Sequence, residues 1–404
     1  MAKRLAILTV GLLLAGTEAS AQSAGEALRG ALFGPNEFTS TGALSEDSTA
    51  TLYGLLLGET ATFPVGTSAG GFTWIFDSNL RVPIRRSASF GPMFAERPFT
   101  TGRRRLNVGA LFQHTSFVSV GGQPLTELEY FTSYSGGEEV YNYTSSVEIA
   151  IDRWVVSATY GIFDKLDVGV ILPLGNSRVS GVAAFYQLVE GEESTTREEV
   201  SGSSFGLGDF VIRTKAALIA SRTLDAAVAL DLRLPTGDTE KLLGTGHMQT
   251  KLLFIAGTTV GSAMPHVNLG YTFGGSGMKF GPDDRWEGSE GDPALIEREP
   301  SEEFNYTVGA DVAATPRITV AGDLIGRIVK NSASMRPFAG GSEDADVERF
   351  LAVTPGTQHL LLGAVGVKVN IGGSWLATAT ILFPLNDNGI RPAVTPVVGF
   401  ERSF

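Results

Sequence analysis

Hydrophobic and polar residues alternate along most of this chain from Leu106 to Phe404, and this two-residue period restricts the fold more than any other feature. Near the C-terminus, Val398 and Phe400 would share one face of an extended strand, with Glu401 on the opposite face. Successive side chains of a β-strand point to opposite faces, so each such segment has one apolar and one polar side. The alternation therefore predicts an all-β protein.

The connections between these segments alternate between short turns and long polar stretches. We treat Leu166–Leu188 as one bent strand, because two strands there would break the alternation. Transmembrane β-barrels have short turns at one end and long loops at the other, so the pattern predicts an antiparallel transmembrane barrel of about twelve strands over 106–404. Short turns are expected near residues 163, 221, 261, 315 and 372, and long loops at 190–203, 235–247, 275–302 and 331–357, with a shorter loop at 386–391.

The N-terminal residues have the features of a secretory signal peptide. Lys3 and Arg4 precede a short apolar run, Leu5–Ala15, and Ala19-Ser20-Ala21 provides the small residues of a cleavage site. The apolar run is shorter than the roughly 20 residues that a membrane-spanning helix needs. We therefore expect residues 1–21 to be a signal peptide and the mature chain to lie in the bacterial outer membrane.

Composition excludes several classes of function. The chain contains 50 Gly, only 18% charged residues and no Cys, which favours strands and turns and excludes disulfides and thiolate metal sites. The net charge of −12 argues against a nucleic-acid partner, because phosphate binding requires a basic surface. With four His and no Cys, we expect no transition-metal site and no cofactor.

Residues 22–105 are the least regular part of the chain. The stretch Ser89–Pro98 contains two Pro residues, which are unfavourable in a central strand because Pro cannot donate to the ladder. We interpret 22–105 as a periplasmic extension or a plug folded into the barrel. The alternative is that it contributes one or two strands, which would raise the total to fourteen.

Charged and polar residues lie opposite the aliphatic stripe on several predicted strands. A charge on the lipid-facing side near the membrane midplane would cost about 2–4 kcal/mol for Arg or Lys, so these residues are expected to face the barrel interior, the lumen. Their mixed signs predict cross-strand pairs such as Arg213 or Lys215 with Asp231. They would form either a charged pore or a salt-bridged filling of a narrow barrel. The candidate lumen-lining residues are Asp209, Arg213, Lys215, Asp231, Arg233, His266, Asn268, Asp311, Asp323, Arg327 and Lys368.

One pair of residues suggests nucleophilic catalysis. His114 and Ser116 lie two positions apart and would share a strand face, and outer-membrane phospholipases use a similar His-x-Ser pair oriented by an Asn. Nucleophile, base and orienting group must lie within hydrogen-bonding reach, and the sequence does not identify the third group. We therefore expect a polar strand end at this position and no enzymatic activity. Gly244-Thr245-Gly246 is expected to be a loop rather than a phosphate-binding site, because no Lys-Ser/Thr follows it.

The C-terminal residue Phe404, preceded by Gly399, resembles the terminal signal of bacterial outer-membrane barrels, although Arg402 stands where that signal usually has an apolar residue. This resemblance implies that the last strand pairs with the first and that the barrel-assembly machinery recognises Phe404.

Several turn and strand motifs between Tyr160 and Phe404 resemble the family described as "putative MetA-pathway of phenol degradation". The resemblance implies an outer-membrane, transporter-like barrel and a link to the uptake of aromatic compounds. The motifs are Leu232-Arg233-Leu234-Pro235-Thr236-Gly237-Asp238, Leu243-Gly244-Thr245-Gly246, Gly206-Leu207-Gly208-Asp209, His266-Val267-Asn268-Leu269-Gly270-Tyr271 and Leu382-Phe383-Pro384-Leu385.

Three hypotheses about function follow. The first is a channel for passive uptake of small solutes, including aromatic or hydrophobic ones, with outer-membrane lipid and lipopolysaccharide as its surroundings. The second is a sealed barrel that acts as a surface scaffold or adhesin through acidic loops. The third is a lipid-active barrel hydrolase that uses His114 and Ser116.

Overall fold

Twelve strands form a closed antiparallel barrel, as the alternation predicts. The computed structural model describes residues 22–33, 54–56, 58–64, 71–77, 82–85, 87–135, 138–189, 191–221, 223–276, 279–282, 293–297, 300–341 and 347–404. The predicted signal peptide, 1–21, lies outside these residues. The wall consists of β3 (Leu106–Val120), β6 (Glu138–Phe163), β7 (Leu166–Val189), β9 (Phe210–Ala220), β10 (Asp225–Leu234), β11 (Gln249–Gly257), β12 (Ala263–Ser276), β15 (Pro300–Thr315), β16 (Ile318–Gly341), β17 (Val347–Gly372), β18 (Trp375–Pro384) and β20 (Thr395–Ser403).

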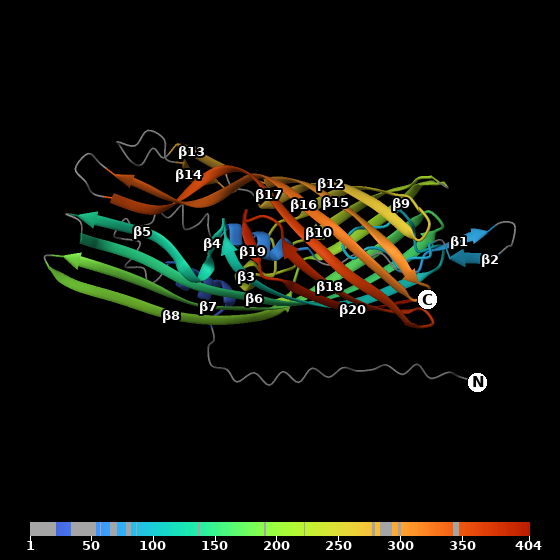
Figure 1. Ribbon diagram of the computed structural model, residues 1–404, viewed down its shortest axis with the longest axis horizontal. Helices are drawn as coiled ribbons and strands as arrows, with labels where there is room; N and C mark the ends of the chain where they lie inside the picture. The colour runs from blue at the N-terminus through green and yellow to red at the C-terminus, as the bar shows by residue number, and fades with distance from the viewer. Residues whose placement is uncertain are drawn as a thin grey trace.

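The ring closes between the last wall strand and the first. Val398 of β20 pairs with Phe112 of β3. At the end of the seam, the Phe404 backbone N–H donates to the Leu106 carbonyl oxygen at 2.8 Å, and the Leu106 N–H donates to Phe404 at 3.3 Å. Among the described residues of the twelve-strand ring, closure leaves no open sheet edge, which is the condition for strands to span a bilayer. Figure 1 shows the C-terminus and the β1–β2 hairpin at one end of the barrel and the longest strand extensions at the other.

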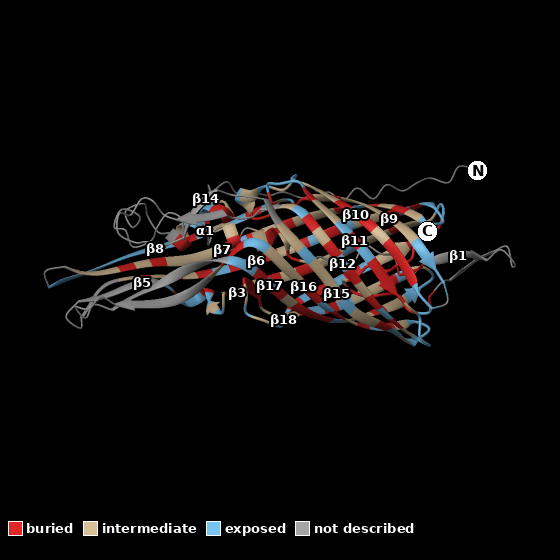
Figure 2. Ribbon diagram, turned by 90° about the horizontal axis from the view of Figure 1, so that it is seen from above, coloured by how far each residue is buried: buried red, intermediate tan, exposed pale blue. Residues whose placement is uncertain are grey.

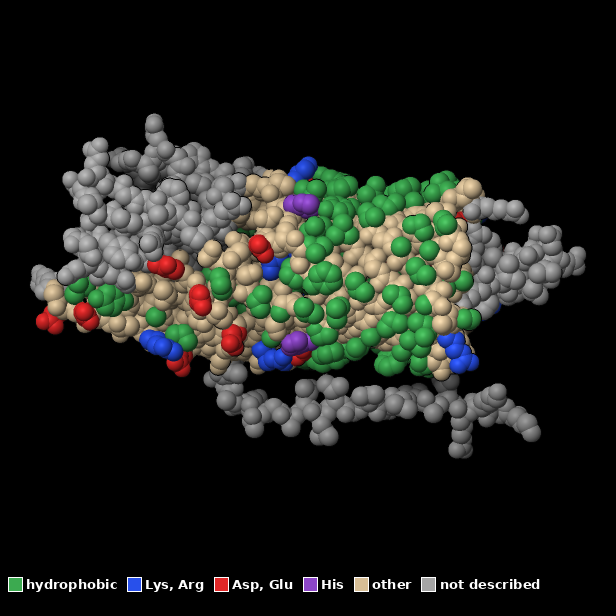
Figure 3. Space-filling model, viewed as in Figure 1, with side chains coloured by type: hydrophobic (Ala, Val, Ile, Leu, Met, Phe, Trp, Pro, Cys, Tyr) green, Lys and Arg blue, Asp and Glu red, His purple; other side chains and the backbone are tan. Residues whose placement is uncertain are grey.

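The side chains follow the predicted alternation between the outer surface and the lumen. On β10, Leu230 is 41% exposed on the outside, whereas the next residue, Asp231, is buried inside. Figure 2 shows buried residues interspersed along the wall strands, and Figure 3 shows hydrophobic side chains covering the end of the barrel that bears the short turns. An apolar belt outside and charges inside are typical of outer-membrane barrels. Among the described residues, no helix combines the length and apolarity needed to span a bilayer.

The predicted long loops at 190–203 and 331–357 are partly wrong, because most of these residues continue as strands. β8 (Glu192–Leu207) pairs with β7 over its whole length, and β16 and β17 remain paired up to Gly341 and Val347. These extensions contain many polar residues on both faces, so the apolar-polar alternation that marks a wall strand is absent. Backbone pairing does not require that alternation once the strands leave the hydrocarbon. Smaller strands there and at the barrel rim are β4 (Gln123–Pro124), β5 (Leu128–Ser135), β13 (Lys279–Pro282), β14 (Pro293–Glu297) and β19 (Ile390–Pro392), with 3-10 turns η2 (Leu125–Glu127) and η3 (Thr239–Lys241).

The described parts of the N-terminal segment add no strand to the wall. Its two strands, β1 (Trp74–Asp77) and β2 (Val82–Arg85), pair only with each other. Helix α1 (Ala24–Phe33) packs against β6, β7 and β8, where the Tyr143 hydroxyl donates to the Leu32 carbonyl oxygen at 2.9 Å. The ring therefore contains twelve strands rather than fourteen.

Candidate functional site in the lumen

A row of polar side chains crosses five neighbouring strands inside the barrel. The strand register places Arg213 of β9 beside Asp231 of β10, and Asp231 beside Lys251 of β11. The row continues through Thr272 of β12 to Glu303 of β15. Each of these residues follows or precedes an outward-facing apolar residue, so the two-residue period places all five on the lumen side.

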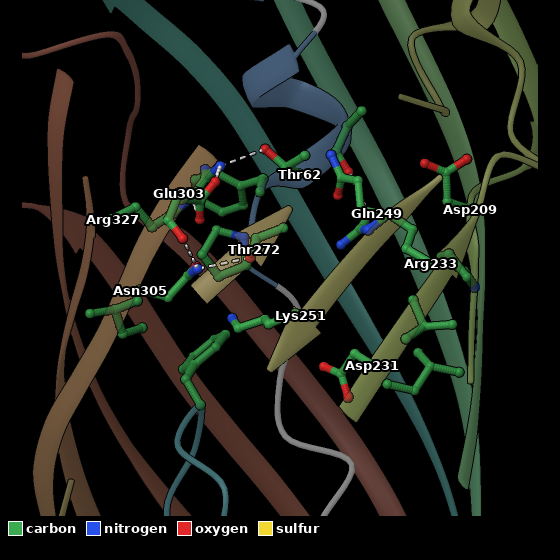
Figure 4. A pocket seen from close by; sticks show the side chains of 18 of the residues that line it. Thr62, Asp209, Asp231, Arg233, Gln249, Lys251, Thr272, Glu303, Asn305 and Arg327 are labelled. Atoms are coloured by element: carbon green, nitrogen blue, oxygen red, sulfur yellow. Dashed lines mark hydrogen bonds and ion pairs between the residues drawn. The ribbon is translucent and has the colours of Figure 1, made fainter. Parts of the chain in front are cut away.

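This row borders a cavity of about 210 Å³. Figure 4 shows that the labelled side chains of Asp231, Lys251, Glu303 and Arg327 come from different strands and extend toward the cavity. The cavity is also bordered by the N-terminal segment through Thr62, Phe94 and Glu96. Six of the predicted lumen residues line it, namely Asp209, Arg213, Asp231, Arg233, Asn268 and Arg327.

Two ion pairs hold charges in fixed positions on this wall. Arg213 binds Asp231 through two hydrogen bonds, from Nε at 2.6 Å and from Nη2 at 2.5 Å, and also contacts Glu96. This confirms the predicted cross-strand pair. Arg327 binds Glu303 in the same way, at 2.8 and 2.7 Å. Such two-point Arg–carboxylate contacts fix orientation as well as charge.

Three other cations on the cavity make no ion pair with a carboxylate among the described residues. Arg153 donates to the Thr60 carbonyl oxygen at 2.8 Å, and Arg233 reaches the Ala61 carbonyl oxygen at 3.5 Å. Lys251 has no hydrogen-bond partner in the described part of the chain, and Figure 4 shows its ammonium group extending into the open space. Five cations and four carboxylates thus line the cavity, and three of the cations contact none of these carboxylates.

The other predicted lumen residues contact the N-terminal segment or each other rather than this cavity. Lys215 lies 3.4 Å from Glu96, and the Lys368 ammonium donates to the Phe90 carbonyl oxygen at 3.4 Å. Asp323 accepts hydrogen bonds from the backbone N–H groups of Met93 and Phe94, at 3.1 and 2.9 Å. Its other oxygen lies 2.8 Å from Nε2 of His266, whose Nδ1 is 3.4 Å from Asp311.

Contacts with the N-terminal segment continue along the lumen. Glu96 and Asn268 exchange two hydrogen bonds, from the Glu96 N–H at 2.6 Å and from the Asn268 amide at 3.0 Å. Nearer the short-turn end, the Thr101 N–H donates to buried Asp167 at 2.7 Å. The segment therefore satisfies polar groups of the wall that would otherwise be buried without partners.

A partly buried carboxyl group fixes this segment near the strand-extension end. Glu59 accepts a hydrogen bond from the Ile390 N–H at 3.2 Å. Burial raises the pKa of Glu59 to about 7, and the nearby Arg391 and Arg327 offset only part of this effect.

Sequence reasoning missed several residues of the cavity. Lys251 and Glu303 precede Leu252 and Phe304 on predicted strands, so the same alternation could have placed them inside. Arg153 lies beside outward-facing Trp154 and could have been found in the same way. The contribution of Glu96 could not have been found from the alternation, because its segment has no regular period.

The turn motifs noted in the sequence meet in space around Asp209. Its carboxylate accepts hydrogen bonds from the Gly237 N–H at 3.0 Å and from the Thr245 N–H and hydroxyl at 2.9 and 2.7 Å. Gly237 and Gly244 approach so closely that a Cβ on Gly244 would lie 2.3 Å from the Gly237 backbone. These motifs thus build one folded loop between β10 and β11.

The sequence model of the family described as "Putative MetA-pathway of phenol degradation" matches residues 132–361, more than half of the chain. The chain belongs to this family. The match includes the loop around Asp209 and all five strands of the polar row. A comparison with curated protein sequences finds no match.

Solved structures that the chain resembles include an outer membrane channel, a FadL homologue and a hydrocarbon channel. The COG4313 outer membrane channel from Pseudomonas putida F1 has 12% identity and a TM-score of 0.47, over 76% of this chain and 97% of that chain. A Pseudomonas aeruginosa FadL homologue has 8% identity and a TM-score of 0.31, over 74% and 90%. The CymD monoaromatic hydrocarbon channel has 9% identity and a TM-score of 0.29, over 75% and 89%.

Proposed function

We propose that the protein is a passive outer-membrane channel for small solutes, with a preference for those that carry an anionic group on an apolar or aromatic body. The observation that supports this most directly is the cavity inside the closed barrel, whose wall presents Arg153, Arg233 and Lys251 without contacting carboxylates. Phe94, Ile171 and Leu253 add apolar surface to the same cavity. A few fixed charges among apolar groups are typical of small-molecule sites.

Family membership supports the aromatic part of this proposal, because the family description refers to phenol degradation. A phenolate or an aromatic carboxylate would place its charge near the cations and its ring against the apolar residues. Long-range attraction to the cations would raise the local concentration of such solutes. The channel therefore requires no energy input to favour them.

We further propose that residues 22–105 act as a plug that controls access to the lumen. Thr60, Ala61 and Thr62 contact Arg153, Arg233 and Arg327 directly, so this part of the segment covers the cations of the cavity. Displacement of residues 58–64 would expose all three guanidinium groups together.

Conductance of the refolded mature chain in a planar bilayer tests the channel. We expect stepwise openings with anion preference, and we expect Lys251→Ala to reduce that preference. Lys330→Ala is the matched control, because Lys330 is half-exposed and pairs with Glu302 rather than lining the cavity. Equal reversal potentials for the wild type and Lys251→Ala would contradict the role of this cation.

Deletion of residues 22–86 tests the plug while keeping residues 87–105, which bind the wall. Conductance that increases on deletion would support the plug. A folded protein that is silent with and without the segment would refute the channel and favour a sealed surface scaffold.

Assembly provides a separate proposal. Phe404 is 54% exposed on the outer face, and Arg402 stacks against its ring with a guanidinium-to-centroid distance of 4.4 Å. We expect the exposed terminal ring to be recognised by the barrel-assembly machinery, and removal of Phe404 to lower the folded fraction in outer membranes. An unchanged folded fraction would contradict this.

A further inference from the structure

A Ser, a His and an Asp form a linear hydrogen-bonded arrangement on the outside of the barrel. The Ser116 Oγ lies 3.2 Å from Nε2 of His114, and Nδ1 of His114 lies 2.6 Å from Oδ1 of Asp152. His114 and Ser116 belong to β3, and Asp152 lies directly opposite His114 on β6. The orienting group that the sequence did not reveal is therefore a carboxylate on the neighbouring strand.

These three side chains face away from the lumen. Val118, two residues beyond Ser116, is 47% exposed, and Trp154, two residues beyond Asp152, is 40% exposed. Gln113 and Thr115, on either side of His114, are buried on the other face. The His114 side chain is 40% exposed and Ser116 is partly exposed, so this face of the cluster is in contact with the surroundings of the barrel.

The cluster lies at the edge of the apolar belt. The neighbouring cross-strand pair on the same face is Phe112 with Trp154, whose rings are 5.3 Å apart, and Trp154 contacts Phe205 at 6.4 Å. Aromatic residues mark the membrane–water interface of barrels. Figure 3 shows hydrophobic side chains giving way to charged and His side chains at such a border. Acyl ester bonds of membrane lipids lie at this depth, between chains and headgroups.

The hydrogen bonds determine the tautomer that catalysis would require. A carboxylate only accepts, so the proton of the neutral imidazole is on Nδ1 and Nε2 is free to accept from the Ser116 hydroxyl. A nucleophile next to a base that is oriented by a third group is the arrangement of serine hydrolases on unrelated folds. A purely structural ion pair between His114 and Asp152 would not require a hydroxyl at this position.

Arg178 supplies a positive charge on the same row of residues as the nucleophile, two strands away. Ser116, Ala150 and Arg178 are consecutive partners across β3, β6 and β7, and the small Ala150 separates the other two. Nη1 of Arg178 donates to Oδ2 of Asp152 at 2.7 Å, which uses one of the five N–H groups of the guanidinium. The remaining N–H groups can stabilise an oxyanion that forms near Ser116.

We propose that Ser116, His114 and Asp152 hydrolyse acyl esters of lipids at the outer edge of the membrane. Ser116 Oγ attacks the ester carbonyl carbon while His114 Nε2 takes its proton, and Arg178 stabilises the tetrahedral oxyanion. The ester C–O bond then breaks, His114 returns the proton to the departing lyso-lipid alcohol, and the acyl group remains on Ser116. Water, deprotonated by His114, attacks this acyl ester, and the fatty acid leaves as Ser116 regains its proton. Asp152 is a positioning residue that holds the imidazole.

The test uses the refolded mature chain in mixed phospholipid–detergent micelles and in phospholipid vesicles. We expect release of fatty acid and lyso-lipid, and covalent labelling of Ser116 by a fluorophosphonate that mass spectrometry locates. Ser116→Ala should lower hydrolysis by at least about a hundredfold. Ser180→Ala is the matched control, because Ser180 is another exposed Ser that bonds to Glu148 rather than to an imidazole.

A second pair of variants separates positioning from folding. Asp152→Ala should slow fluorophosphonate labelling while heat-modifiable gel mobility shows a folded barrel, and Asp152→Glu should restore part of the labelling, because its carboxylate can still accept from Nδ1. Wild-type protein that releases no fatty acid and is not labelled would overturn the proposal. Wild-type activity of Ser116→Ala would also overturn it. Cleavage of a water-soluble short-chain ester without cleavage of vesicle phospholipid would do the same.

Discussion

Consecutive residues of β6 belong to two different polar clusters on opposite faces of the wall. Arg153 points inward, is buried and donates to the backbone of the N-terminal segment. Asp152 points outward and joins half-exposed His114 and Arg178. Inside, charges are held mainly by partners from other strands and from the segment, as in Arg213 with Asp231 and Glu96. Outside, the ion pairs of Asp152 leave the proposed nucleophile Ser116 and much of the Arg178 guanidinium partly exposed.

Burial decides what a polar cluster on a barrel wall can do. A buried charge that loses its partner is left desolvated, so the inner cluster is committed to structure and to setting the charge of the cavity. An exposed pair contributes little to stability because water and salt screen it. Substitutions in the outer cluster should therefore change the free energy of unfolding only slightly, so its residues are free to serve a chemical role.

The largest expected loss of stability follows from a substitution on the inner face. Arg213→Ala leaves Asp231 and Glu96 buried without their guanidinium, and we expect the free energy of unfolding to fall by about 3–5 kcal/mol. Urea unfolding of the protein refolded in lipid vesicles measures this. A loss below about 1 kcal/mol would show that the inner charges are more solvated than their burial indicates.

The next effect concerns pH and the attachment of the N-terminal segment. Because the folded structure raises the pKa of Glu59 from 4.5 to about 7, folding favours the protonated carboxyl. The stability that Glu59 contributes is fully present below pH 4.5 and is lost as the pH rises to about 7. Glu59→Gln stays neutral and should flatten the dependence of the unfolding midpoint on pH over this range.

Thermal unfolding of the wild type and of Glu59→Gln, followed at a series of pH values, checks this prediction. Arg391, Arg327 and Glu303 also act on Glu59, so the comparison uses the difference between the two proteins at each pH. If the unfolding midpoints of the two proteins changed in parallel from pH 4 to 8, the prediction for Glu59 would be contradicted.

The smallest expected effect on stability is on the outer face. Arg178→Ala removes an ion pair whose Arg side chain is 46% exposed, and we expect a loss below about 1 kcal/mol. The same variant should lower fatty-acid release, because it removes the cation proposed to stabilise the oxyanion. A stability loss as large as that of Arg213→Ala would remove the distinction between the two faces.

The sequence alone determined the barrel, because lipid outside and polar groups inside impose a two-residue period that can be read without coordinates. It also determined which side of the wall residues such as Asp231 and Arg233 occupy. It failed for the strand extensions beyond the membrane, including β8, where water on both sides removes the period.

The pairing of the polar groups depends on the three-dimensional fold. Asp152 lies 38 residues from His114, and their contact depends on the register between β3 and β6, which the alternation leaves free in steps of two residues. Glu96 reaches Arg213 across 117 positions because an irregular segment enters the lumen, and no local pattern encodes that path. Composition and period select the fold, whereas register and the course of the N-terminal segment place the charges and the nucleophile.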